Sequence, residues 1–128
     1  MNKLFAVLLV SILISSCAIE QITNDIDIDE FRKKIASHNY VLVDVRTEKE
    51  FDDGHIENAL NIDYFSATFS DEISNIGLEK PVLVYCRSGN RSGKSMRIMS
   101  DLGFKEVYNL IGGIKGWKAK NNRLIKNK

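Results

Sequence analysis

The segment with the clearest capacity for chemistry is a short polar loop that begins with a cysteine. Residues 86–92 read Cys-Arg-Ser-Gly-Asn-Arg-Ser. A cysteine reacts as its thiolate, and nearby cations or converging amide N–H groups lower the pKa of the thiol. Arg87 and Arg91 supply two permanent positive charges, and Gly89 permits the tight backbone curve that brings successive amides together. We therefore expect Cys86 to be a nucleophile with a lowered pKa.

The same loop suits an anionic substrate. Amides in such a curve form an anion-binding nest, and a helix that begins directly after it adds the positive end of its dipole. The candidate substrate-binding residues are the six that follow the cysteine: Arg87, Ser88, Gly89, Asn90, Arg91 and Ser92. We expect Ser92 to cap the helix and Asn90 to contribute mainly its backbone amide. An inert buried cysteine with solvent-facing arginines is the alternative, and the Arg-Gly-Arg-Ser cluster argues against it.

The N-terminus has the features of an export signal. Lys3 precedes an apolar run over 4–14, and the small residues Ser15 and Ser16 lead to Cys17. As a helix this run would extend about 16 Å, roughly half of the hydrocarbon core of a bilayer, which is too short to span it. The order of a basic residue, an apolar stretch and small residues is typical of a secretory signal peptide.

The segment Ile14-Ser15-Ser16-Cys17 resembles the lipobox of bacterial lipoprotein precursors. The resemblance implies that residues 1–16 are removed, that Cys17 carries lipid, and that the protein is anchored in the bacterial cell envelope, facing the periplasm or another extracytoplasmic side. Residues 17–25 would then be the lipidated cysteine and a short tether that leads into a first strand. An ordinary secretory peptide is the alternative. With Cys17 lipidated, Cys86 is the only free thiol, which favours use of its chemistry over a disulfide.

Apolar and helical patterns alternate along the rest of the chain. We expect strands at 41–44, 59–62, 82–85 and 107–110, and helices at about 28–37, 47–53, within 65–78, at 91–102 and after Gly112-Gly113. This alternation predicts an α/β domain with a parallel sheet covered on both faces. Active sites in such folds lie at the carboxyl ends of the strands, and Cys86 directly follows the apolar strand 82–85.

Two charged residues are expected to support the loop. Asp44 and Arg46 stand at the end of a strand, and Asp44 is expected to pair with Arg91 or to accept hydrogen bonds from the loop. Arg46 is expected to reach Glu50. His55 is expected to make a structural hydrogen bond, because a thiolate of low pKa needs no general base.

Three segments in order resemble the motifs of the rhodanese family. They are Val43-Asp44-Val45-Arg46 with Glu50-Phe51 and Gly54-His55-Ile56; the loop 86–92; and Leu110 with Gly112-Gly113 and Gly116-Trp117. Glu57 and Asn58 depart from the family's usual Pro and Gly, which affects a turn and not the chemistry. The resemblance covers about residues 22–120. It implies a single rhodanese domain at 26–122, with a three-layer fold whose central, mostly parallel, five-stranded sheet has helices on both faces.

The resemblance also implies a function. Cys86 would take sulfane sulfur from thiosulfate or a similar anion as a persulfide and pass it to a thiol or to cyanide, with no cofactor and no metal. Four residues separate Cys86 from Arg91, as in the sulfur-handling members, whereas related phosphatases and arsenate reductases have one more. A non-catalytic sulfur carrier or a rhodanese-like binding module is the alternative.

The charge of the chain gives no sign of a nucleic-acid partner. There are 18 Lys and Arg residues against 17 Asp and Glu, and removing residues 1–16 takes away only Lys3, which leaves 17 against 17. A nearly neutral protein has no general attraction for polyanions. Residues 123–128 are expected to form a basic, solvated and partly frayed tail.

Overall fold

The computed structural model describes residues 20–127, so the predicted signal peptide and Cys17 lie outside the described residues. The strands are β1 (Ile22–Ile26), β2 (Val41–Asp44), β3 (Leu60–Asn61), β4 (Val82–Tyr85) and β5 (Glu106–Leu110). The helices are α1 (Ile28–Ala36), α2 (Glu48–Asp52), α3 (Phe69–Ser74), α4 (Asn90–Leu102) and α5 (Gly113–Ala119). Each strand and helix expected from the sequence has a counterpart here, with β3 and α3 shorter than their predicted ranges.

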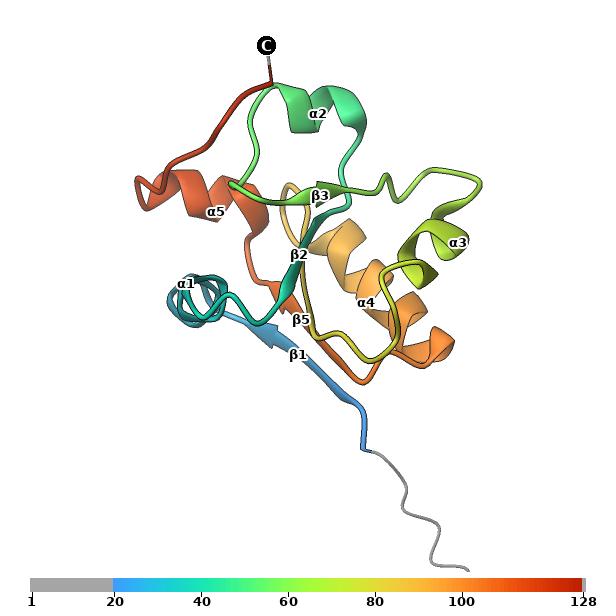
Figure 1. Ribbon diagram of the computed structural model, residues 1–128. Helices are drawn as coiled ribbons and strands as arrows, with labels where there is room; N and C mark the ends of the chain where they lie inside the picture. The colour runs from blue at the N-terminus through green and yellow to red at the C-terminus, as the bar shows by residue number, and fades with distance from the viewer. Residues whose placement is uncertain (1–19, 128) are drawn as a thin grey trace, which may run out of the picture.

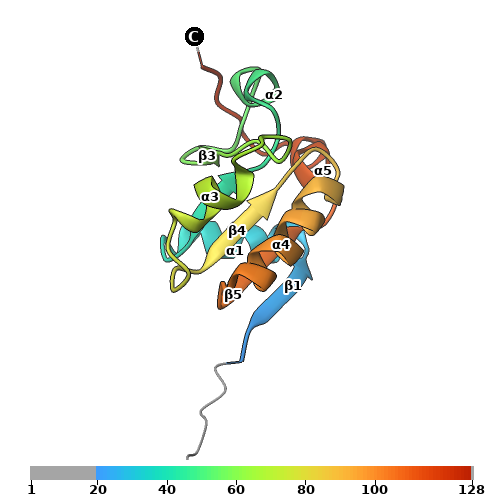
Figure 2. The same ribbon diagram turned by 90° about the vertical axis from the view of Figure 1, so that its right-hand side faces the viewer.

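The strands form one sheet in the order β1-β5-β4-β2-β3, and every neighbouring pair is parallel. All four residues of β4 are buried, because neighbouring strands flank it and helices cover both of its faces (Figures 1 and 2). This position explains its uninterrupted apolar sequence. The expected α/β fold with a central five-stranded sheet is confirmed.

Two apolar clusters hold the helices against the two faces of the sheet. On one face, α1 and α5 contribute Ile28, Phe31, Ile114 and Trp117, which pack on sheet residues such as Leu83 and Leu110. On the other face, α3 and α4 contribute Phe69, Ile73 and Met99, which pack on Val43, Val84 and Val107. Figure 2 shows α3 and α4 in front of β4 and α1 behind it. The alternation of side chains along each strand assigns its residues to the two clusters.

Local hydrogen bonds fix where two helices begin. The Thr47 side chain accepts a bond from the Glu50 amide while the Glu50 carboxylate accepts one from the Thr47 amide, so a capping box opens α2. Asp27 caps α1 by accepting a bond from the Glu30 amide at 2.9 Å. The short helix α2 therefore has a defined start beside the end of β2.

Both ends of the described chain are more ordered than the sequence suggested. Most of β1 falls within residues 17–25, the expected tether. Instead of a tether, this segment is the edge strand of the sheet, and it pairs with β5 along its whole length. The end expected to fray docks beside α2: Ile125 exchanges two backbone hydrogen bonds with His55, each 2.9 Å, and the Asn127 side chain donates to Asp52 at 2.7 Å. The C-terminus accordingly lies next to α2 in Figure 1.

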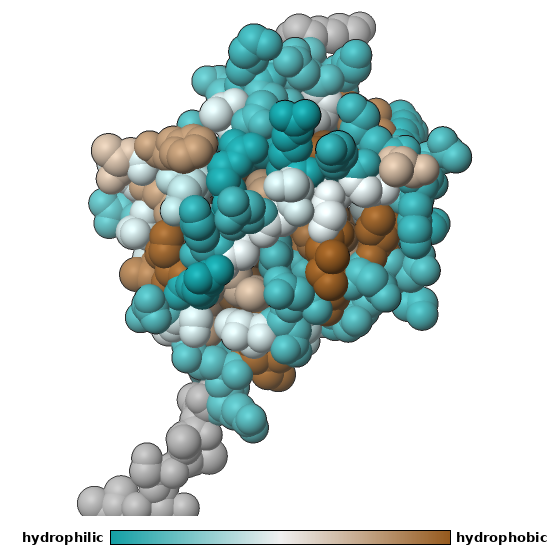
Figure 3. Space-filling model, turned by 180° about the vertical axis from the view of Figure 1, so that it is seen from behind, coloured by the Kyte–Doolittle hydropathy of each residue, from teal (hydrophilic) through white to brown (hydrophobic). Residues whose placement is uncertain are grey.

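The surface carries no large apolar face in the view from behind. Hydrophobic side chains form small separate patches in a mainly hydrophilic surface (Figure 3). Between residues 20 and 127, no helix has the length and apolar character needed to cross a bilayer.

Tyr85 ties β4 to the segment after α2 and provides a test of the fold. Its side chain is 0% exposed, and its hydroxyl accepts a hydrogen bond from the Ile56 amide at 3.0 Å. Tyr85→Phe leaves that buried amide without its acceptor, so the free energy of unfolding is expected to fall by about 1–3 kcal/mol. Urea denaturation at pH 7 measures this.

Tyr64→Phe is the matched control, because the Tyr64 hydroxyl makes no hydrogen bond with any described residue and the change should stay below about 0.5 kcal/mol. Equal effects of the two substitutions would show that the Tyr85 hydroxyl does not stabilise the fold.

Candidate active site

Cys86 stands at the carboxyl end of β4, where the chain leaves the sheet and curls into α4. Its side chain is 1% exposed. The Sγ atom accepts hydrogen bonds from the Gly89 amide at 3.1 Å and from the Ser92 hydroxyl at 3.2 Å. Gly89 has a φ of 101°, a left-handed conformation that a side chain would disfavour, and this conformation turns its amide back toward the sulfur. The predicted cradle of donors around Cys86 is thus present.

The pKa of the Cys86 thiol lies below its ordinary value. Burial raises it, but hydrogen bonds from the Ser92 hydroxyl and from the amides of Ser92, Gly89 and Ser88 outweigh that effect. The direction agrees with the prediction from the sequence. Its cause differs in part, because the main contributions come from hydrogen bonds and not from the guanidinium groups that the sequence made prominent.

The start of α5 holds the loop from the other side. The amides of Ile114 and Lys115 donate to the carbonyls of Cys86 and Arg87 at 2.9 and 3.1 Å. Gly113, at a φ of 56°, lies so close that a Cβ there would stand 2.6 Å from the Cys86 carbonyl oxygen. The Gly112-Gly113 pair therefore does more than turn the chain into a helix, because it allows α5 to approach the backbone of the loop that begins at Cys86.

Arg91 pairs with Glu50, and not with Asp44 as expected. Its two terminal nitrogens donate to the two Glu50 carboxylate oxygens at 2.8 and 2.9 Å, a bidentate pair. Arg91 lowers the pKa of Glu50 to about 2. The stabilisation from this pair is therefore complete above the ordinary carboxyl pKa and is lost only as the pH falls through about 2. Part of the Arg91 charge is thus balanced by Glu50 and is not directed at the sulfur alone.

Asp44 instead pairs with Arg46, two residues along the chain. Asp44 is fully buried, and its carboxylate accepts three side-chain bonds from Arg46 between 2.7 and 3.1 Å and one from the Arg46 amide. Arg46 also donates to the Gly54 carbonyl at 2.7 Å, so the expected contact of Arg46 with Glu50 is replaced by this one. Residues two apart in an extended chain share one face, which favours the local partner over one across the site.

The remaining loop residues take different positions. Ser92 is buried and donates to the sulfur, so it is not the cap of α4 that the sequence suggested; Gly89 occupies the cap position. Asn90 is exposed and opens α4, and Arg87 and Ser88 are exposed on the loop. Glu50 was not among the site residues expected from the sequence, which named it only as a partner of Arg46; its place in the capping box of α2 brings it beside the end of β2.

Three residues near the site have structural surroundings. The His55 ring nitrogen Nδ1 lies 2.8 Å from the Phe51 carbonyl, which confirms the expected structural hydrogen bond. Trp117 and Phe104 are buried, as expected for core residues, and Trp117 packs edge-on against Phe31.

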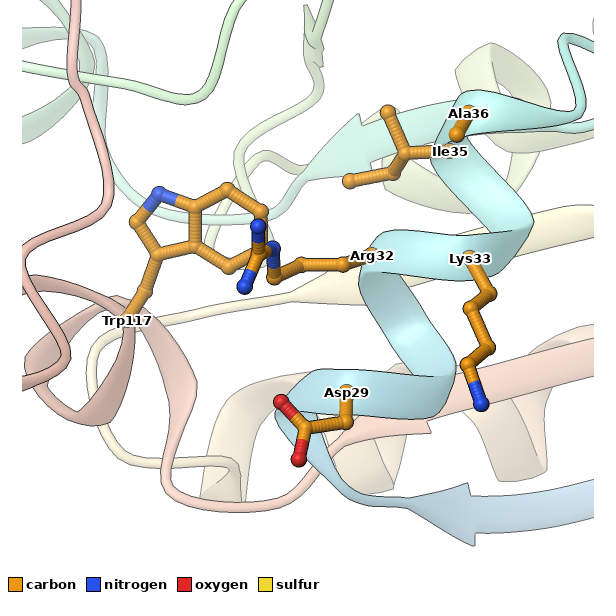
Figure 4. A pocket seen from close by; sticks show the side chains of 6 residues that line it. All are labelled: Asp29, Arg32, Lys33, Ile35, Ala36 and Trp117. Atoms are coloured by element: carbon orange, nitrogen blue, oxygen red, sulfur yellow. The ribbon is translucent and has the colours of Figure 1, made fainter.

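Two hollows differ in their relation to the loop. One of about 450 Å³ borders Arg87 and is lined also by Arg46, Glu50, Asp53, Ile114, Lys115 and Lys118. The other, of about 620 Å³, lies between α1 and Trp117, and the side chains around it in Figure 4 come from outside the Cys86 loop. The first hollow is the candidate substrate site, because Arg87, the residue after Cys86, lines it. Among residues 20–127, no three His, Cys, Asp or Glu side chains are grouped to hold a metal ion.

The hydroxyl of Ser92 offers a direct test of the sulfur's surroundings. Ser92→Ala removes one donor, and a hydrogen bond to a charged acceptor contributes about 1.5–3 kcal/mol, so the thiol pKa should rise by about 1–2 units. The pH dependence of Cys86 alkylation by iodoacetamide measures the shift.

Ser95→Ala is the matched control, since Ser95 is equally buried on α4 but donates to the Arg91 carbonyl at 2.8 Å. If both variants give the wild-type profile, the Ser92 hydroxyl does not stabilise the thiolate.

Comparisons with known proteins identify the family of the chain. The family model of the rhodanese-like domain matches residues 27–120. Thiosulfate sulfurtransferase GlpE of Coxiella burnetii is 39% identical over 85 residues, covering 66% of this chain and 78% of that protein. YqhL of Bacillus subtilis is 32% identical over 117 residues, covering 91% and 90%. The crystal structure of a rhodanese-related protein from Thermoplasma volcanium superposes with a TM-score of 0.71 at 26% identity, covering 81% and 99%. The chain belongs to the rhodanese-like family.

Proposed function

We propose that this protein is a sulfurtransferase that carries sulfane sulfur on Cys86 as a persulfide. The observation that carries the proposal is the pair of donors, the Gly89 amide and the Ser92 hydroxyl, aimed at Sγ. Such donors stabilise negative charge on sulfur, both on the attacking thiolate and on the persulfide that replaces it. The name of the relative from Coxiella burnetii supports thiosulfate as donor.

The proposed reaction has two balanced steps. The Cys86 thiolate attacks the outer sulfur of thiosulfate, a new S–S bond forms on Cys86, and the old S–S bond breaks as its electron pair leaves with sulfite. A thiolate or cyanide then attacks the outer sulfur of the persulfide and takes it, which restores the Cys86 thiolate. No external oxidant or reductant is required, and no proton has to be removed by a base once the thiol is ionised.

The charges around the loop favour an anionic donor. Arg87, Lys115 and Lys118 line the hollow that borders the loop, together with the acidic residues Glu50 and Asp53. In the described part of the chain, none of these three basic residues has an ion-pair partner within 4 Å. Clustered cations raise the local concentration of anions. Because Cys86 is almost fully buried, a donor with a terminal, unhindered sulfur fits the site better than a bulky one.

Mass spectrometry after incubation with thiosulfate tests the proposal. A gain of about 32 Da on the peptide containing Cys86, reversed by cyanide, is expected, because one sulfur is added and removed per cycle. Cys86→Ala should show neither the gain nor thiocyanate formation in a steady-state assay.

The same measurement separates the two candidate roles. Persulfide formation with thiocyanate release at each turnover supports the enzyme. A persulfide that forms without turnover supports a stoichiometric sulfur carrier. No mass gain on Cys86 with thiosulfate or with polysulfide would exclude both and leave a binding module.

The proposal extends to the place where the protein works. The lipobox-like Ser15-Ser16-Cys17 supports a lipid anchor in the bacterial cell envelope. Each buried CH₂ of an acyl chain contributes about 0.8 kcal/mol, so several chains together give durable attachment. The globular domain would then handle sulfur outside the cytoplasm, close to a membrane surface.

Cys17→Ser in the full chain tests the anchor. We expect the wild-type protein in the membrane fraction and in the detergent phase, and the variant in the soluble fraction or uncleaved. A control with Cys86→Ser should partition like the wild type, because Cys86 is far along the chain from the signal. Unchanged membrane attachment of the Cys17 variant, with normal cleavage of its signal, would refute lipidation at this residue.

A further inference from the structure

A second layer of hydrogen bonds lies behind the loop, on the side of β1 and β5. Asn109 is in β5 and is 4% exposed. Its Nδ2 group donates to the Asp25 carboxylate at 2.8 Å and to the Gly89 carbonyl at 3.3 Å. Both acceptors are oxygens, which fixes which end of the side-chain amide faces the loop. Asn109 thus joins the edge strand β1, its own strand and the residue that donates to the Cys86 sulfur.

Gly89 is held on both of its sides. Its amide donates to Cys86 Sγ at 3.1 Å, while its carbonyl accepts from Asn109 and also from the Gly93 amide at 3.0 Å. A glycine has no intrinsic preference that would keep it in this left-handed conformation, so its orientation depends on what its amide and carbonyl contact. Asn109 is the only side chain of the described residues that donates to this carbonyl.

Stability alone does not account for an asparagine at this position. Its Oδ1 atom is buried and accepts no hydrogen bond from any described residue. A buried acceptor without a donor is destabilising, and native proteins rarely keep one. Val107, two residues earlier in β5 and therefore on the same face of the sheet, is apolar and fully buried, so an apolar side chain at 109 would suit that face. The donation by Nδ2 is what an apolar replacement would lose.

We propose that Asn109, oriented by Asp25, is a positioning residue that holds Gly89 so that its amide faces the Cys86 sulfur. It acts through Gly89 and does not itself contact Sγ. The inference rests on the proposed function, since the sulfur it serves is the one that carries the persulfide. It assigns to β1 a part in the site that the three sequence motifs do not indicate, because Asp25 precedes all of them.

Asn109→Leu tests the inference, since leucine has a similar volume but neither donates nor accepts. The rate of Cys86 alkylation by iodoacetamide at pH 7 is expected to fall by about three- to tenfold, with the midpoint of its pH profile moved upward, because a misaligned amide stabilises the thiolate less. The midpoint of urea unfolding should stay the same or rise, because the unpartnered Oδ1 is removed as well. A purely structural role would lower the unfolding midpoint and leave the alkylation profile unchanged.

Two further variants keep the test decisive. Asp25→Asn retains an oxygen that can accept from Asn109 and should preserve the wild-type profile, whereas Asp25→Leu should reproduce part of the loss. If Asn109→Leu does not fold, the difference between the alkylation profiles of Asp25→Asn and Asp25→Leu tests the positioning role instead. Gln21→Leu is the control: its side-chain amide likewise joins the N-terminal segment to α4, through the carbonyls of Ser100 and Phe104 at 2.9 and 3.0 Å, but at the end remote from the loop.

The outcomes separate this inference from the proposed function. A folded Asn109→Leu variant with the wild-type alkylation profile overturns the positioning role, as does equal behaviour of Asp25→Asn and Asp25→Leu. If the wild-type protein forms no persulfide but Asn109→Leu still shifts the alkylation profile, the positioning role stands and only the sulfur-transfer proposal fails.

Discussion

The arrangement of this protein depends on the hydrogen bonds that surround one buried sulfur. Burial at the end of a central strand opposes ionisation of the Cys86 thiol, so the donors from Ser92 and from the loop amides must outweigh it for the pKa to be lowered. Amide and hydroxyl donors act only at short range and in one direction, unlike a nearby cation. The reactivity of Cys86 is therefore a property of loop geometry, and whatever fixes that geometry contributes to the chemistry.

Three parts of the fold fix the loop independently. The first turn of α5 binds the carbonyls of Cys86 and Arg87, the bidentate Arg91–Glu50 pair ties the start of α4 to α2, and Asn109 connects Gly89 to β1. A parallel sheet makes this possible because it brings the carboxyl ends of strands to one edge. The loop is thus held by contacts with α5, α2 and β1, which are distant from it in sequence.

The sequence predicted the helices and strands and the ring of donors around Cys86, because both depend on local patterns. The apolar run 82–85, the capping box Thr47–Glu50 and the polar loop 86–92 each carry their signal within a few residues. The pairing of the charged residues was not evident from the sequence, because each acidic residue had more than one possible basic partner. In the structure Asp44 binds Arg46, two residues along the chain, and Arg91 reaches across to Glu50. The order of the C-terminal end was missed for a similar reason, since a basic, glycine-free stretch gives no sign that Ile125 pairs with His55.

The low exposure of Cys86 bears on selectivity under the proposed mechanism. A thiolate enclosed by its own loop is shielded from large oxidants and disulfides. Addition of one sulfur extends the reactive atom by about 2 Å, the length of an S–S bond. In the loaded form the outer sulfur, and no longer Sγ itself, is the atom that an acceptor has to reach. Under the proposed mechanism, only small donors would reach the free Cys86 thiolate, whereas larger acceptors could approach the outer sulfur of the persulfide. The burial of Cys86 would then select different partners in the two steps of the reaction.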